Sequence, residues 1–281
     1  MASCRYIWLI GFVVSVGCIQ RNQQEDVGKL TPERLTGDVI TDTTILIDTT
    51  TMVQIEGGKF KPLFGSNDSA VLIPSFAIDQ HAVTNSQFIE FLKRNPRWRK
   101  SKVRRIFTDE NYLIKWKNDT IPPEYQSLNS PVTNISWFAA KDYCNCMGKE
   151  LPTVNQWEYV GAAGKIKPDE RKEESYNKNI LTWYKSPKGT GATIYSTQSN
   201  YFDVWDMHGL IWEWTYDFNE VMLSGESRRD VSTDNDLFCG SGSIGATDLM
   251  NYAAFMRYAF RGSLKANYSI NNLGFRCVTN K

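Results

Sequence analysis

Histidine is scarce in this chain, which has only His81 and His208 among its 281 residues. An iron site of two histidines and one carboxylate would therefore require both residues to converge. Neither sign of charge predominates, because 32 basic residues are offset by 31 acidic ones. The net charge therefore gives no electrostatic reason to expect nucleic acid as a partner. The glycine-rich stretch 240–245 (GSGSIG) contains no Gly-Lys-Ser/Thr sequence, which excludes a phosphate-binding loop there.

The N-terminal apolar run is short. It extends from Tyr6 to Val16 after Arg5, too few residues to span a bilayer but enough for the apolar region of a signal peptide. It ends in SVGC (15–18), which resembles a bacterial lipoprotein cleavage site with Cys18 as the lipidated residue. Residues 1–18 are therefore predicted to be a signal peptide, and the mature chain a membrane-anchored lipoprotein facing the periplasm or the cell exterior. Ordinary secretion with cleavage nearby is the alternative.

Residues 19–51 are expected to be a flexible tether, because Gln, Asn, Asp and Thr dominate them and their only apolar run is Ile45-Leu46-Ile47. A folded domain is expected over 52–281, where 41% hydrophobic residues in the whole chain suffice for a core. Its strand-like pieces are short and separated by Gly, Asn, Asp and Pro, which predicts an irregular α+β fold with long loops.

Three helices can be predicted from capping signals. Asn85–Arg94 has Thr84 or Asn85 as its N-cap, and 136–147 begins at Ser136, whose hydroxyl can accept a hydrogen bond from the first turn. A third helix is expected to begin at Thr153.

The segment 206–214 (DMHGLIWEW) places an acid among tryptophans. Trp212 and Trp214 share one face of an extended segment, so Glu213 points the other way and needs donors or a cation if it is buried. Carboxylates of Asp206 and Glu213, with backbone carbonyls between them, are ligands that suit calcium. The alternative is a tryptophan-rich core turn with a solvated glutamate.

The same segment and five others, in the same order, resemble the formylglycine-generating-enzyme family, also called sulfatase-modifying factors. The six stretches are 52–60 (MVQIEGGKF), 83–88 (VTNSQF), 131–144 (PVTNISWFAAKDYC), 151–159 (LPTVNQWEY), 206–214 (DMHGLIWEW) and 273–277 (LGFRC). The resemblance implies the fold of that family, which is related to C-type lectins. It also implies a structural calcium ion held by the side chains of Asp206 and Glu213 and by the backbone carbonyls of Gly209 and Ile211.

Four cysteines besides Cys18 follow the leader, and an oxidising compartment makes disulfides plausible among them. Their number allows three pairings. The family resemblance implies a disulfide between Cys144 and Cys277. Cys146 lies two residues after Cys144 in a predicted helix and faces away from it. Cys146 and Cys239 could form a second disulfide, stay as two inert thiols, or bind a soft metal.

Formylglycine-generating enzymes bind copper and activate oxygen with a pair of cysteines near the C-terminal arginines. In the register of this family, Asp248 and Ala253 occupy the two reactive positions. Neither supplies the thiolate that copper(I) prefers. Formylglycine formation is therefore not expected, and copper is left open as a cofactor only through a soft-metal site at other cysteines.

Residues 238–239 and 245–257 look like members of the family that are accessory proteins of copper nitrite reductase. The expected function is an accessory factor for an exported metalloenzyme, with a copper-containing respiratory enzyme as its protein partner. One rival is an oxidoreductase that modifies a protein cysteine, and another is a structural or ligand-binding lipoprotein.

A basic segment spans Lys93 to Arg105, with eight basic residues and no acidic one in thirteen positions. It is expected either to dock an acidic partner or lipid headgroups, or to be a solvated helix end.

Overall fold

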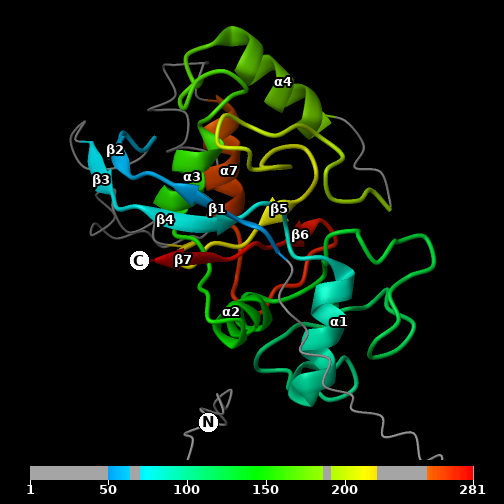
Figure 1. The fold of residues 1–281 in the computed structure, drawn as a ribbon. Helices are drawn as coiled ribbons and strands as arrows, with labels where there is room; N and C mark the ends of the chain where they lie inside the picture. The colour runs from blue at the N-terminus through cyan, green and yellow to red at the C-terminus, as the bar shows by residue number, and fades with distance from the viewer. Residues whose placement is uncertain (1–49, 64–69, 186–190, 220–251, 281) are drawn as a thin grey trace, which may run out of the picture. The chain divides into compact units, whose positions relative to one another are not determined.

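The computed structural model describes residues 50–63, 70–185, 191–219 and 252–280, all within one compact unit, Asp48–Lys281 (Figure 1). The predicted signal peptide, Cys18 and nearly all of the predicted tether lie outside these ranges. No helix within the ranges is long and apolar enough to cross a bilayer.

The strands are short and form three small sheets. The first has the order β1-β4-β7 and is antiparallel throughout, with Ile55 opposite Phe76 and Phe76 opposite Asn280. A second antiparallel pair joins β2 and β3, and a parallel pair joins β5 and β6. The bounds are β1 Met52–Ile55, β2 Gly58–Phe60, β3 Val71–Ile73, β4 Phe76–Asp79, β5 Trp212–Glu213, β6 Leu273–Gly274 and β7 Val278–Asn280.

The described helices are α1 Asn85–Arg94, the 3₁₀ turn η1 Pro96–Trp98, α2 Trp137–Cys146, α3 Val154–Gly161, α4 Glu174–Lys185 and α7 Tyr252–Gly262. The starts of α1, α2 and α3 agree with the capping signals. Thr84 caps α1 in a capping box with Gln87, and Thr153 caps α3 in the same way. Ser136 caps α2 by accepting from the backbone of its first turn. The sequence reasoning did not predict α4 or α7.

Two large apolar clusters and a smaller one between α4 and α7 build the core of the described residues. One lies around α1 and α2 and includes Phe88, Trp214 and Phe275, each completely buried. The other packs α3 against the β1-β4-β7 sheet through Trp157 and Val160. Figure 1 shows α3 and α7 beside each other behind this sheet, with α4 near their far end. Few regular elements and long connections make this the irregular α+β domain that the sequence predicted.

Candidate functional site

The loop that leads into β5 is wound tightly. Asp206 and Gly209 both have positive φ, +58° and +95°. A Cβ atom on Gly209 would lie 3.0 Å from the Trp183 ring, so only glycine fits both the backbone conformation and the contact. The buried carboxylate of Asp206 accepts hydrogen bonds from the backbone of Tyr195 (2.6 Å) and from the backbone and hydroxyl of Thr197 (2.8 Å each). Asp206 therefore ties the loop to the preceding connection.

Glu213 is held by three donors from distant parts of the chain. Arg276 forms a bidentate pair with it, with both N···O distances 2.8 Å, and the indole nitrogen of Trp157 donates at 2.7 Å. The residue is 5% exposed. The prediction that this acid is satisfied by donors or a cation is confirmed, and the alternative of a solvated glutamate is wrong.

The four residues of the expected calcium site can be tested against these contacts. Glu213 Oε1 and Asp206 Oδ2 each accept one hydrogen bond among the described residues, and a carboxylate oxygen can accept two. Each side chain thus keeps acceptor capacity for a hard cation, and the backbone carbonyls of Gly209 and Ile211 lie between them in the chain. The donor types fit calcium. Arg276 already neutralises the Glu213 carboxylate, so calcium would bring a second positive charge to it.

Calcium binding stays a prediction with a direct test. Adding calcium to chelator-treated protein should raise the melting temperature, because a ligand that binds only the folded state stabilises it by about 2.7 kcal/mol at a hundredfold excess over its dissociation constant. The Asp206→Asn variant should lose the response. Identical melting curves with calcium and with chelator would contradict the site.

Another buried carboxylate, that of Glu158 on α3, is paired with two arginines of α7. Arg257 binds both of its oxygens, at 2.9 and 2.7 Å, and Arg261 binds one at 2.6 Å. Burial by itself raises the pKa of Glu158, but the two guanidinium charges outweigh this effect and hold its pKa at about 2. Both guanidinium groups also lie over the ring of Trp157, at 5.6 and 4.8 Å from its centroid. Trp157 therefore contacts both ion pairs: its indole nitrogen donates to Glu213, and its ring lies under the two arginines that bind the adjacent residue, Glu158.

Ala253, which the sequence register predicts to stand at a reactive-cysteine position of the family, lies at the start of α7. It is 2% exposed and forms an apolar cluster with Tyr176 and Ile180 of α4. The hydroxyl of Tyr184 lies 3.5 Å from its carbonyl oxygen and 3.4 Å from Arg257. The methyl group of Ala253 offers no metal ligand. Asp248, at the other reactive position, lies outside the described residues.

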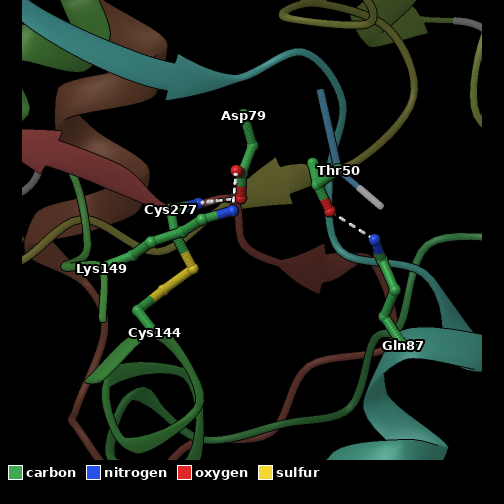
Figure 2. Close-up of a disulfide and its surroundings, with 6 residues drawn as sticks. All are labelled: Thr50, Asp79, Gln87, Cys144, Lys149 and Cys277. Carbon is green, nitrogen blue, oxygen red and sulfur yellow. Dashed lines mark hydrogen bonds and ion pairs between the residues drawn. A yellow bond between two sulfur atoms is a disulfide. The ribbon is translucent and has the colours of Figure 1, made fainter. Parts of the chain in front are cut away.

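Cys144 and Cys277 are joined by a disulfide between α2 and the residue before β7, and this is the pair that the resemblance implies. Figure 2 shows the bond beside Asp79, whose carboxylate accepts from the Cys277 backbone at 2.9 Å and from Lys149 at 2.7 Å. A buried ion pair and a disulfide therefore fix the C-terminal strand at the same place.

Cys146 is also disulfide-bonded, which agrees with the first of the three alternatives for this residue. Cys239, the partner suggested for it by the sequence, lies outside the described residues. All three cysteines of the described ranges are thus oxidised.

The two histidines have structural partners. The Nδ1 atom of His81 lies 2.8 Å from the carbonyl oxygen of Ala82, and the Nε2 atom of His208 lies 2.8 Å from that of Gly161. Burial, together with the positive charge of Arg257, lowers the pKa of His208 to about 3, so its ring is neutral at neutral pH. The described residues contain no group of three or more His, Cys, Asp or Glu side chains that could hold a metal ion.

A cleft of about 580 Å³ opens beside the Gly209–Ile211 turn. Trp183 forms one part of its wall, and side-chain amides and hydroxyls line much of the rest. Among the described residues that line it, Lys115 is the only one with a formal charge at neutral pH. This volume is within the range of small-molecule sites.

Comparison with known proteins shows the family to which this chain belongs. Residues 39–281 match the family model of the sulfatase-modifying factor enzyme 1-like domain. Over 82% of its length the chain is 26% identical to the inactive C-alpha-formylglycine-generating enzyme 2 of Bos taurus, and it covers 88% of that protein. It is 28% identical over 61% of its length to the serine/threonine-protein kinase pkn1 of Chlamydia caviae, of which it spans 29%. The solved structure of CarF covers 83% of the chain at 17% identity, with a TM-score of 0.45.

The family match covers all of the described residues, including Glu158, Glu213 and the Cys144–Cys277 disulfide. The chain belongs to the family of sulfatase-modifying factor enzyme 1-like domains.

Proposed function

We propose that this chain is a non-catalytic sulfatase-modifying factor domain that acts as an accessory factor for an exported metalloenzyme. The observation that carries the proposal is Ala253, which occupies a reactive-cysteine position and is buried against α4. Copper(I) prefers soft thiolate ligands, and alanine supplies none. Asp248, in the other reactive position, supplies a hard carboxylate.

The other cysteines near the core do not replace the missing pair, because Cys144, Cys146 and Cys277 are oxidised to disulfides. A disulfide sulfur is not a thiolate, which is the form that binds metal. The inactive enzyme from Bos taurus, which the chain resembles over most of its length, supports the same interpretation. A domain that is retained without its catalytic residues is proposed to act by binding another protein.

The place of action is proposed from the leader, with Cys18 as the lipidated residue and a membrane-anchored domain facing the periplasm or the cell exterior. The partner is proposed from residues 238–239 and 245–257, whose pattern resembles accessory proteins of copper nitrite reductase. The proposed partner is therefore a copper-containing respiratory enzyme.

Deleting the gene for this chain should lower nitrite reductase activity per amount of reductase protein in a strain that has both. Restoring the wild-type chain should recover the activity, and so should the Asp248→Ala variant, because the proposal assigns no catalysis to that position. Unchanged reductase activity and copper content in the deletion strain would exclude this partner.

The cleft beside Gly209–Ile211 favours a second candidate, a ligand-binding lipoprotein, because its volume and its largely polar lining, with Lys115 as the one charged residue among the described lining residues, suit a small polar molecule. The deletion experiment separates the two, since a ligand-binding lipoprotein has no reason to alter the reductase.

A further inference from the structure

The basic segment Lys93–Arg105 begins in the last turn of α1 and is anchored by some of its own cations. Arg97 pairs with Asp142 at 2.7 Å. Arg99 donates to the carbonyl oxygen of Leu92 at 3.1 Å, and Lys100 donates to those of Ile114 and Trp116 at 2.8 and 2.9 Å. Lys93 also pairs with Glu90 at 2.6 Å, and the Asp119 carboxylate accepts from the backbone and hydroxyl of Ser101. The segment thus contacts three acids but has eight basic residues, so it keeps an excess of positive charge.

Four other cations of the segment point to solvent. Arg94, Lys102, Arg104 and Arg105 are exposed and form no ion pair among the described residues. Arg104 lies over the ring of Phe107, 5.9 Å from its centroid. Burial raises the pKa of Asp119, but hydrogen bonds from Ser101 and the charges of Arg99 and Lys102 outweigh this effect and lower it, so Lys102 lies near an acid. The segment therefore presents four exposed positive charges, and Lys102 shares its surroundings with Asp119.

An exposed apolar side chain lies next to these charges. Ile106 is 67% exposed, whereas the following residue, Phe107, packs on Trp98 with ring centroids 5.8 Å apart. Trp98 is itself buried. Phe107 therefore packs inward on the domain, whereas Ile106 is exposed directly after Arg104 and Arg105. An exposed apolar side chain beside basic ones is a combination found at membrane interfaces.

We propose that Arg94, Lys102, Arg104 and Arg105, together with the exposed side chain of Ile106, form a docking surface for the anionic phospholipid headgroups of the membrane that carries the lipid anchor. The proposal rests on the proposed membrane attachment. Headgroup phosphates are dispersed over a plane and require cations without a shaped pocket. The lining residues of the three cavities found in the described structure all lie outside Lys93–Arg105. An acidic protein would also match these charges, so the choice of the membrane rests on where the tether joins the domain.

The place where the tether joins the domain supports this partner. Thr50, at the start of the described chain, accepts a hydrogen bond from Gln87 in the first turn of α1 (Figure 2). The basic segment begins at the other end of the same ten-residue helix, about 15 Å away at 1.5 Å per residue. An unstructured chain as long as residues 19–51 has an average end-to-end distance of about 30 Å. A lipid at Cys18 would therefore keep the basic segment within reach of the bilayer.

The test uses the mature chain from Ile19 onward, so that neither the apolar leader nor an acyl group contributes, and co-sedimentation with vesicles. Vesicles of phosphatidylcholine mixed equally with phosphatidylglycerol should bind the protein, and vesicles of phosphatidylcholine alone should not. Binding should weaken as salt is added. Replacing the four exposed cations by serine should lower the affinity by about a hundredfold or more, because each cation near an anionic surface contributes about fivefold. Ile106→Ser should weaken binding by a smaller factor.

A matched control removes four exposed lysines elsewhere, namely Lys59, Lys172, Lys178 and Lys265. It should bind anionic vesicles nearly as well as the parent. Equal losses in the two quadruple variants, or equal binding to both kinds of vesicle, would overturn the proposal. Retention on immobilised polyglutamate without vesicle binding would also overturn it and indicate an acidic protein instead. Failure of the lipoprotein proposal would be seen separately, as a mature native protein without an acyl group by mass spectrometry.

Discussion

Replacing Glu158 by glutamine is expected to lower the free energy of unfolding by about 3–5 kcal/mol, the usual cost of removing one partner from a buried ion pair. The side chains of Glu158, Arg257 and Arg261 are each 4% exposed or less. With the carboxylate gone, two buried guanidinium groups lose their counter-charge, and glutamine can accept only part of their hydrogen bonds. Urea unfolding, followed by tryptophan fluorescence, measures the change.

The matched control is Glu124→Gln, which neutralises an exposed acid and should change stability by no more than about 0.5 kcal/mol. The double variant Glu158→Gln with Arg257→Met should recover part of the loss, because it removes one of the uncompensated charges. A loss below about 1 kcal/mol for Glu158→Gln would show that the network contributes little, since such a value is ordinary for any single substitution.

Removing the Cys144–Cys277 disulfide is expected to cost about 5 kcal/mol in the chain-entropy model, because it closes a long loop. The two residues are 133 positions apart and both completely buried. The bond joins α2 to the C-terminal strand, whose pairing with β4 depends on residues that follow Cys277 directly. The variant with both cysteines changed to alanine should therefore unfold at markedly lower denaturant concentration.

Reductant provides the control for this variant. It should destabilise the wild-type protein more than the double-alanine variant, because in the variant it can act only on the remaining disulfide at Cys146. If the variant and the wild type differed by less than about 1 kcal/mol, the entropic account of this bond would be wrong for this chain.

Local signals predicted much of this fold. The starts of α1 and α3 can be read from Thr84 with Gln87 and from Thr153 with Gln156, because a capping box involves residues only three positions apart. The satisfied environment of Glu213 could also be anticipated, since a carboxylate between two tryptophans needs a partner. Its identity, Arg276, is 63 residues away and could not be read from spacing.

The Glu158 network was missed for the same reason. Its arginines lie 99 and 103 residues from the carboxylate, and only the packing of α7 against α3 brings them together. Both α4 and α7 do show apolar residues at helical spacing, such as Tyr176, Ile180 and Trp183 in α4. That periodicity is a signal that could have predicted them.

The most direct test of the central claim is incubation of the purified chain with copper, reductant, oxygen and a sulfatase peptide that contains the target cysteine. An active formylglycine-generating enzyme serves as the parallel control. The account predicts that the peptide mass stays unchanged with this chain, because Ala253 and Asp248 cannot form a copper thiolate site. Conversion of the cysteine to formylglycine, abolished when Cys239 is replaced, would contradict the account and show that the soft-metal site has moved within the fold.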